Sequence, residues 1–157
     1  METLKDVLAL SPQFWAVLGA AVAFLIAAIG SAKGVYIVGL ASAGLVAEDS
    51  NKFVPAMILE ALPSTQGIYG FVAAFMILGK LSPDLSIEKG LMLFLASLPI
   101  AIVGAFSAIY QGKVAASAVG IVAKRSSDMV KGMILALTVE LFALFALLVT
   151  ILMIGKV

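Results

Sequence analysis

Four long apolar segments follow one another along the chain, and short polar stretches separate them. The segments run over about 13–47, 53–79, 90–123 and 132–154, while charged residues, Ser and Asn gather between them. A helix of about 20 residues, rising about 1.5 Å per residue, crosses the hydrocarbon core of a bilayer. The pattern therefore predicts an all-α membrane protein with four transmembrane helices.

The first and third segments are longer than a bilayer requires, and both carry small residues at helical spacing. These are Gly30, Gly34, Gly39 and Gly44 in the first segment and Gly104, Ala108, Gly112, Ala116 and Gly120 in the third. Small side chains let helix backbones approach closely. Two interpretations stay open: ordinary packing of membrane helices, or a more specific close contact.

The second half of the chain repeats the first. With a shift of 76 residues, 44–59 aligns without a gap on 120–135, and half of the aligned positions are identical. The repeat predicts two tandem helical hairpins, 1–80 and 81–157. A two-span hairpin keeps its orientation when it is repeated, so the two are expected to be related by an axis along the membrane normal.

Composition narrows the function classes. Hydrophobic residues make up 63% of the chain and charged residues 12%, which excludes an ordinary soluble domain. A net charge of +1 without a basic cluster excludes nucleic acid as a partner. Cys and His are absent, which excludes disulfides, thiolate or imidazole metal sites and His-assisted nucleophiles.

The ends and loops give an expected orientation. Residues 1–15 lack the basic region, apolar stretch and cleavage site of a signal peptide, so the first span is expected to be retained. Phe14 and Trp15 are expected at the membrane interface. More Lys and Arg stand beside the loops inside the hairpins than on the other side, which predicts cytoplasmic loops and outward-facing termini.

One carboxylate interrupts the fourth apolar segment. Glu140 is the only charged residue between Gly132 and Ile154, and it lies near the predicted midplane. Inserting such a group costs about 2.5 to 3.5 kcal/mol, so a proton, a cation or hydrogen-bond donors must compensate it. Glu140 is therefore the leading candidate for a functional residue.

Neutral oxygens on other spans are predicted to lie at the same depth. Counting from the nearest polar loop places Gln66 and Gln111 near the level of Glu140. Pro63 frees carbonyl groups of the turn before it, and Thr65 follows directly. Carboxylate, amide, hydroxyl and carbonyl oxygens suit a hard cation, and the neutral ones favour Na⁺ over H⁺.

Other roles of these side chains stay open. Tyr69, three residues after Gln66, is expected to donate its hydroxyl proton to the carboxylate. Thr65, Gln66 and Gln111, each taken alone, also suit simple hydrogen bonding between helices. Glu60 is predicted to be shallower and on another face of its helix, where it meets a neighbour or water, with a pair to Lys33 left open.

Five short segments together resemble the proteolipid, or rotor-ring, subunit of V-type rotary ATPases, in its bacterial sodium-translocating form. They are GSAKG at 30–34, LPSTQGIYGF at 62–71, SLPIA at 97–101, QGKVAA at 111–116 and VE at 139–140. The resemblance covers essentially the whole chain. It implies a Na⁺ site made by the backbone carbonyl of Leu62, the side chains of Thr65, Gln66, Gln111 and Glu140, and a supporting hydrogen bond from Tyr69. The chain departs from the family at Glu60, where an amide is expected, and at Leu141, where Thr is expected.

The resemblance also implies a function and partners. Identical copies are expected to form a ring in the cell membrane that carries Na⁺ as it rotates against a stator subunit bearing an Arg. A central-stalk subunit is expected at the cytoplasmic loops. ATP is expected to react in other subunits, so this chain is predicted to be non-catalytic and to need no organic cofactor. The alternatives are a ring that carries H⁺, a small dimeric cation transporter or channel, and a purely structural proteolipid.

Overall fold

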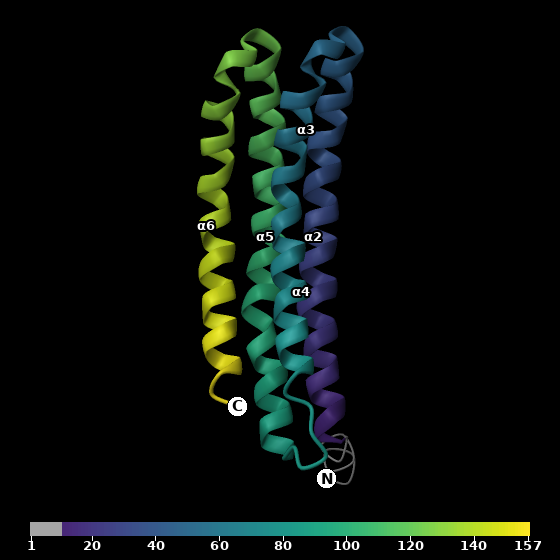
Figure 1. Cartoon of the computed structure of the whole chain (residues 1–157), viewed down its shortest axis with the longest axis vertical. Coiled ribbons are helices and arrows are strands. Elements are labelled where there is room, and N and C mark those ends of the chain that lie inside the picture. Colours follow the sequence, from purple (N-terminus) through teal and green to yellow (C-terminus); the bar gives the residue numbers. More distant parts are fainter. Residues whose placement is uncertain (1–10) are drawn as a thin grey trace, which may run out of the picture.

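The computed structural model describes residues 11–157 as parallel helical columns (Figure 1). In chain order the elements are α2 (Pro12–Glu48), the 3₁₀ turn η1 (Ser50–Lys52), α3 (Phe53–Ala61), η2 (Leu62–Ser64), α4 (Thr65–Leu78), α5 (Ile87–Lys124), η3 (Ser126–Asp128) and α6 (Met129–Ile154). The described residues contain no strand, and four helical segments are long and apolar enough to cross a membrane. The predicted all-α, four-span fold is confirmed, whereas expectations for residues 1–10 lie outside the described part.

Serine caps set the starts of the two longest helices. Ser11 Oγ accepts a hydrogen bond of 3.2 Å from the Phe14 amide, and Ser86 Oγ accepts one of 3.3 Å from the Lys89 amide. Such caps satisfy backbone donors that lack a partner in the first turn. The third span therefore begins at Ile87, one turn earlier than the hydrophobic pattern indicated.

The second span is a single column with a tightened turn at Pro63. The turn η2 separates α3 from α4, which confirms the predicted interruption of this span. Ser31 Oγ on α2 accepts a hydrogen bond of 2.8 Å from the Gly67 amide. This contact fixes the first turn of α4 against α2 directly beyond the proline.

A second cross-helix bond follows the proline inside α5. Thr150 of α6 is fully buried, and its Oγ1 accepts a hydrogen bond of 3.3 Å from the Ile100 amide, the residue after Pro99. A proline inside a helix disturbs the preceding turn and removes one donor. Thr150 therefore ties α6 to α5 at the position where α5 is weakest.

Close packing of α2 on α5 depends on glycine at mid-height. A Cβ on Gly34 would lie 2.4 Å from the Ala108 carbonyl oxygen, and one on Gly112 would lie 2.5 Å from the Gly34 carbonyl oxygen. Nothing lies within 4 Å of the same position on Gly44 or Gly120. The small-residue stripes thus make a specific contact at their centre, but not at their loop ends.

The internal repeat is visible as matching contacts. In the first hairpin, Ser42 Oγ donates to the Ala56 carbonyl at 3.5 Å. Residues 76 positions later form the corresponding contact, where a Cβ on Gly132 would lie 2.6 Å from the Ala118 Cβ. The shift of 76 therefore relates equivalent places in the two hairpins.

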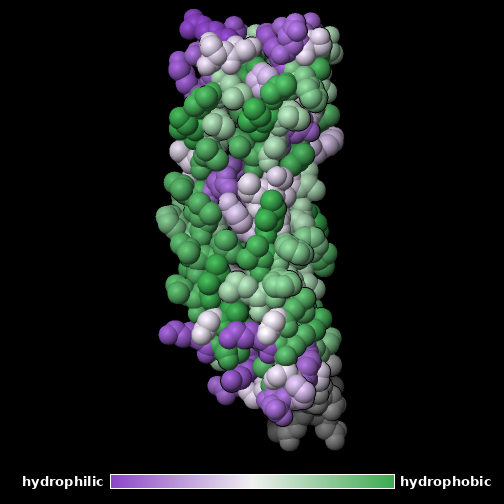
Figure 2. All heavy atoms as spheres, in the orientation of Figure 1, coloured by the Kyte–Doolittle hydropathy of each residue, from purple (hydrophilic) through white to green (hydrophobic). Residues whose placement is uncertain are grey.

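The outer surface is apolar over most of its height. Figure 2 shows a broad hydrophobic belt with polar side chains at both ends and one small polar patch within the belt on the face shown. Large side chains project from this belt, such as Phe75 at 71% and Leu152 at 67% exposure. Such a surface suits lipid or further membrane helices rather than water.

Candidate ion-binding site

Both oxygens of the Glu140 carboxylate are hydrogen-bonded inside the bundle. Glu140 lies on α6 and is 6% exposed. The Tyr69 hydroxyl on α4 donates to Oε1 at 2.6 Å, and Gln111 Nε2 on α5 donates to Oε2 at 3.0 Å. Three helices therefore hold the acid, and its donors compensate part of the cost of burying it.

A second layer of neutral oxygens lies behind Gln111. Gln66 Nε2 donates to Gln111 Oε1 at 2.7 Å, and both amides are fully buried. Thr65 Oγ1 lies 3.3 Å from Gln66 Oε1 and 3.2 Å from the Leu62 carbonyl oxygen. Because one hydroxyl has one proton, Thr65 donates to only one of these oxygens at a time.

The tightened turn at Pro63 explains how these groups meet. Leu62 stands at the start of η2 and Thr65 at the start of α4, so the carbonyl of one faces the hydroxyl of the other. One step along α4, Gln66 points at α5, and one further turn brings Tyr69 to α6. The structure thus joins all six residues singled out from the sequence into one hydrogen-bonded chain.

Ser107 is a member of this network that the sequence analysis did not include. Its hydroxyl donates to the Val139 carbonyl at 3.0 Å and accepts from Gln66 Nε2 at 3.3 Å. It therefore links the α6 backbone beside Glu140 to the Gln66 amide. The available signal was its position, four residues before Gln111 on the same face of one helix.

The charge balance of the site suits a monovalent cation. Within residues 11–157, the two ion pairs lie at the hairpin loops: Lys52–Asp49 at 3.7 Å and Lys131–Asp128 at 3.0 Å. No group of three His, Cys, Asp or Glu residues converges in that part of the chain. Glu140 thus supplies one negative charge among neutral oxygens, which matches one proton or one monovalent ion.

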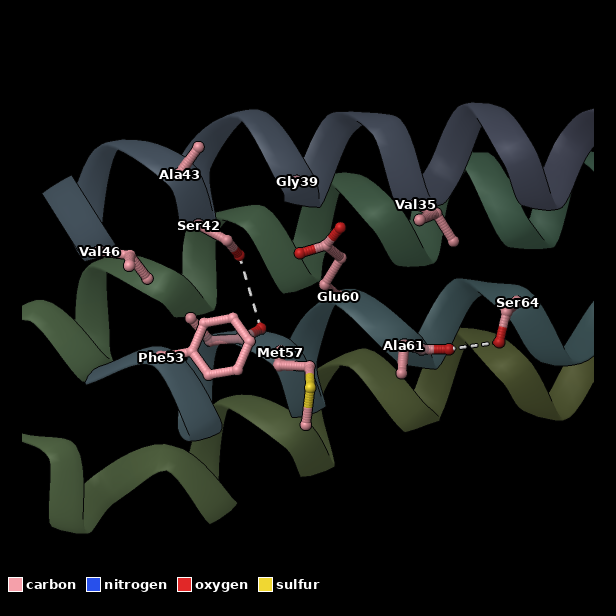
Figure 3. A pocket seen from close by; sticks show the side chains of 11 residues that line it. Val35, Gly39, Ser42, Ala43, Val46, Phe53, Met57, Glu60, Ala61 and Ser64 are labelled. Atoms are coloured by element: carbon pink, nitrogen blue, oxygen red, sulfur yellow. Dashed lines mark hydrogen bonds between the residues drawn. The ribbon is translucent and has the colours of Figure 1, made fainter. Parts of the chain in front are cut away.

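Glu60 is separate from this network. Its carboxylate lies against Gly39 of α2, where an added Cβ would be 3.0 Å from Oε1 (Figure 3). Its counterpart in the second hairpin, 76 residues later, is Ala136, one turn before Glu140. No ion pair to Lys33 is formed in the described structure.

Comparison with known proteins gives consistent matches along the chain. The profile of the ATP synthase C-subunit family matches twice, over residues 18–77 and 94–153. V-type sodium ATPase subunit K of Enterococcus hirae is 46% identical over 140 residues, which cover 89% of this chain and 90% of that protein. A-type ATP synthase subunit K of Methanocaldococcus jannaschii is 40% identical over 145 residues, which cover 90% of this chain and 62% of that protein.

Proposed function

Because the chain belongs to the ATP synthase C-subunit family, we propose that it is a rotor-ring protein that carries Na⁺ across the membrane. Copies of the chain form a closed ring that turns against a stator. ATP is hydrolysed or synthesised in other subunits of the complex, and this chain takes no part in that chemistry. Na⁺ is the transported cargo, and the proposal needs no organic cofactor.

One observation supports Na⁺ as the cargo: the Glu140 carboxylate is linked to neutral oxygens that a proton would not need. A desolvated Na⁺ must regain several oxygen ligands, whereas a proton needs only the carboxylate. The hydroxyl of Thr65, the amides of Gln66 and Gln111 and the Leu62 carbonyl are already connected to the acid. The name of the Enterococcus hirae relative agrees with this choice of ion.

Binding changes the hydrogen bonds between the two buried amides. Gln66 Nε2 now donates to Gln111 Oε1. Na⁺ takes the place of this hydrogen bond and is held by the two amide oxygens, by Thr65 and Leu62, and by Glu140. Tyr69 keeps its hydrogen bond to the carboxylate and holds it in position and ionised.

The position of Glu140 in the membrane explains why transport is coupled to rotation. Without an ion, its charge would cost about 2.5 to 3.5 kcal/mol on exposure to lipid. The ring therefore passes through lipid with occupied sites, and each site empties at the stator, where an Arg side chain pairs with the free carboxylate. The hairpin loops face the cytoplasm and contact the central stalk, and both termini face outward.

The proposal is tested by protection of the carboxylate. A hydrophobic carbodiimide should label Glu140 in the detergent-solubilised protein, and Na⁺ should slow labelling at fixed pH while the same concentration of a large organic cation does not. The double substitution of Thr65→Val with Gln66→Leu should weaken Na⁺ protection and leave the labelling itself intact. Protection by rising pH alone, with no effect of Na⁺, would identify a ring that carries H⁺.

The ring is tested independently by the mass of the assembly. Native mass measurement of the purified protein should give one closed oligomer larger than a tetramer. A dimer would instead support the small transporter or channel and would contradict the rotor.

A further inference from the structure

A cavity of about 570 Å³ opens between α2 and α3 in the first hairpin. Its lining is mainly apolar, with the hydroxyls of Ser42 and Ser64 and the carboxylate of Glu60. Figure 3 shows this carboxylate projecting toward α2 beside Gly39. Within residues 11–157 Glu60 has no ion pair, and in Figure 3 no hydrogen bond joins it to the other side chains drawn. A half-buried acid in an apolar span therefore lacks a partner in its own chain.

The repeat shows that this acid replaces a closed contact. The counterparts of Gly39 and Glu60, 76 residues later, are Ala115 and Ala136, and both are fully buried. Glycine at position 39 leaves room for the longer Glu60 side chain, because a Cβ there would lie 3.0 Å from Oε1. The first hairpin thus places a carboxylate where the second packs methyl groups.

The same repeat indicates what covers the cavity. Within the chain, Ala136 belongs to a cluster with Val38 and Leu59 of the first hairpin, and Leu62 packs against that cluster. A shift of 76 converts these three residues to Val114, Leu135 and Thr138. Leu135 is 57% exposed, Thr138 is exposed and Val114 is half-buried, so they are accessible on the second hairpin. If the second hairpin meets the next copy as the first meets the second, these residues cover Glu60 of that copy.

The chemistry of Thr138 determines how the two side chains can pair. Its Oγ1 donates to the Leu135 carbonyl at 2.7 Å, so its single proton is already used. The hydroxyl oxygen can therefore only accept a further hydrogen bond. A carboxyl group donates one only when it is protonated, and an apolar interface inside the membrane favours this neutral form over an unpaired charge.

We propose that Glu60 is a protonated acid that donates a hydrogen bond to Thr138 of the adjacent copy and so closes the interface between copies. This inference rests on the ring proposed above. It assigns Glu60 to assembly of the ring and leaves ion transport to Glu140.

Other titratable groups near the two faces are accounted for. On α2, Lys33 and Tyr36 are outside the cavity lining. On α5 of the adjacent copy, the Lys113 ammonium lies 5.2 Å from the centre of its own Tyr110 ring. On α6, Glu140 is turned inward and bonded to its own hairpins, as described above. Lys113 is the group that could form an ion pair with Glu60 in place of the Thr138 hydrogen bond.

Cysteine cross-linking tests the geometry, because the chain has no native Cys. Under oxidation, Glu60→Cys combined with Thr138→Cys should give covalent ladders that end at the closed ring. The control pair is Ile29→Cys with Phe106→Cys, which the shift of 76 derives from the close contact of Gly30 with Ala105. Ladders from the control pair alone would overturn the Glu60–Thr138 contact and keep the ring. Ladders from neither pair would overturn the ring itself.

Substitutions test the protonated state. Glu60→Gln keeps a donor and should leave the dissociation temperature of the ring unchanged, while Glu60→Leu and Thr138→Val should each lower it. The double variant Glu60→Leu with Thr138→Val should be no worse than either single one. A ring that is at least as stable with Glu60→Leu would overturn the proposal.

An infrared measurement separates the neutral acid from an ion pair. In a Glu140→Gln background at neutral pH, the carbonyl band of a protonated carboxyl group should disappear with Glu60→Gln and persist with Lys113→Gln. Absence of that band before the Glu60 substitution would overturn the proposal in favour of an ionised Glu60. Na⁺ protection of Glu140 should be the same with Glu60→Gln as in the unmodified chain, since the two carboxylates lie in separate sites.

Discussion

The Tyr69 hydroxyl lies 2.6 Å from Oε1 of Glu140 and joins two residues that are 71 positions apart in the chain. The contact bridges α4 of the first hairpin and α6 of the second. Because a phenol donates only one hydrogen bond, this proton is committed to the carboxylate. Glu140 is thus held by both hairpins, and its position depends on how they pack.

Replacing Tyr69 by Phe should weaken Na⁺ binding without removing the site. A hydrogen bond to a charged group contributes about 1.5 to 3 kcal/mol, so the dissociation constant for Na⁺ should rise at least about tenfold. The measurement is the Na⁺ concentration that halves carbodiimide labelling of Glu140. Tyr110→Phe is the matched control, because that exposed tyrosine has no hydrogen bond to the site. Equal Na⁺ protection in both variants would show that the Tyr69 bond does not support the ion.

Replacing Ser107 by Ala should weaken Na⁺ binding by a smaller factor. Its hydroxyl positions the Gln66 amide and the backbone at Val139, but it is not proposed as a ligand. Loss of a typical hydrogen bond costs about 1 kcal/mol, which corresponds to about fivefold weaker binding. Ser97→Ala is the control, since the buried Ser97 hydroxyl on the same helix donates to its own Phe94 carbonyl. Labelling of Glu140 without Na⁺ should proceed at the same rate in both variants, whereas a changed rate with Ser107→Ala would point to a disturbed carboxylate.

The sequence allowed the long side chains of the site to be predicted, while the short ones escaped it. Glu140, Gln66 and Gln111 stand out because a charge or an amide inside an apolar helix is rare and has a definite depth. Ser107 and Ser31 do not stand out, since serine is common among the small residues of membrane helices. Their roles depend on which neighbouring atom each hydroxyl meets, and that depends on the rotation of the packed helices.

The same limit applies to the glycine stripes. Periodicity places Gly34 and Gly44 in one stripe, but α2 meets α5 closely only at the first of them. Serine caps moved the start of α5 by one turn for a similar reason, because a cap acts through one hydrogen bond rather than through hydrophobicity. Hydrophobic spacing therefore gives the spans, whereas individual contacts set their ends and their crossings.

Replacing Thr150 by Val should destabilise the contact between α5 and α6. The Ile100 amide beside Pro99 would lose its acceptor in a buried setting, and an unsatisfied buried donor costs about 1 to 3 kcal/mol. The midpoint of thermal unfolding in detergent should fall for Thr150→Val. Thr150→Ser keeps the hydroxyl and should recover most of the loss. Equal midpoints for Val and Ser would show that packing volume, and not this hydrogen bond, matters at the position.

Replacing Gly34 by Ala should damage both stability and Na⁺ binding. The new Cβ would lie 2.4 Å from the Ala108 carbonyl oxygen and 2.7 Å from the Pro63 Cβ, so α2 must move away from α5 or from the η2 turn. Overpacking of this kind costs about 1 to 3 kcal/mol. Because Gln111 lies on α5 and the Leu62 carbonyl belongs to η2, either movement separates groups of the ion site.

Gly44→Ala is the matched control for this substitution. It lies on the same helix with nothing within 4 Å of the new Cβ, and alanine favours the helix by about 1 kcal/mol. This variant should unfold at the same or a higher temperature and keep full Na⁺ protection of Glu140. If Gly34→Ala matched it in both measurements, the close crossing of α2 on α5 would not be what holds the ion site together. A loss confined to Gly34→Ala would show that the glycine contact and the carboxylate site form one structural unit.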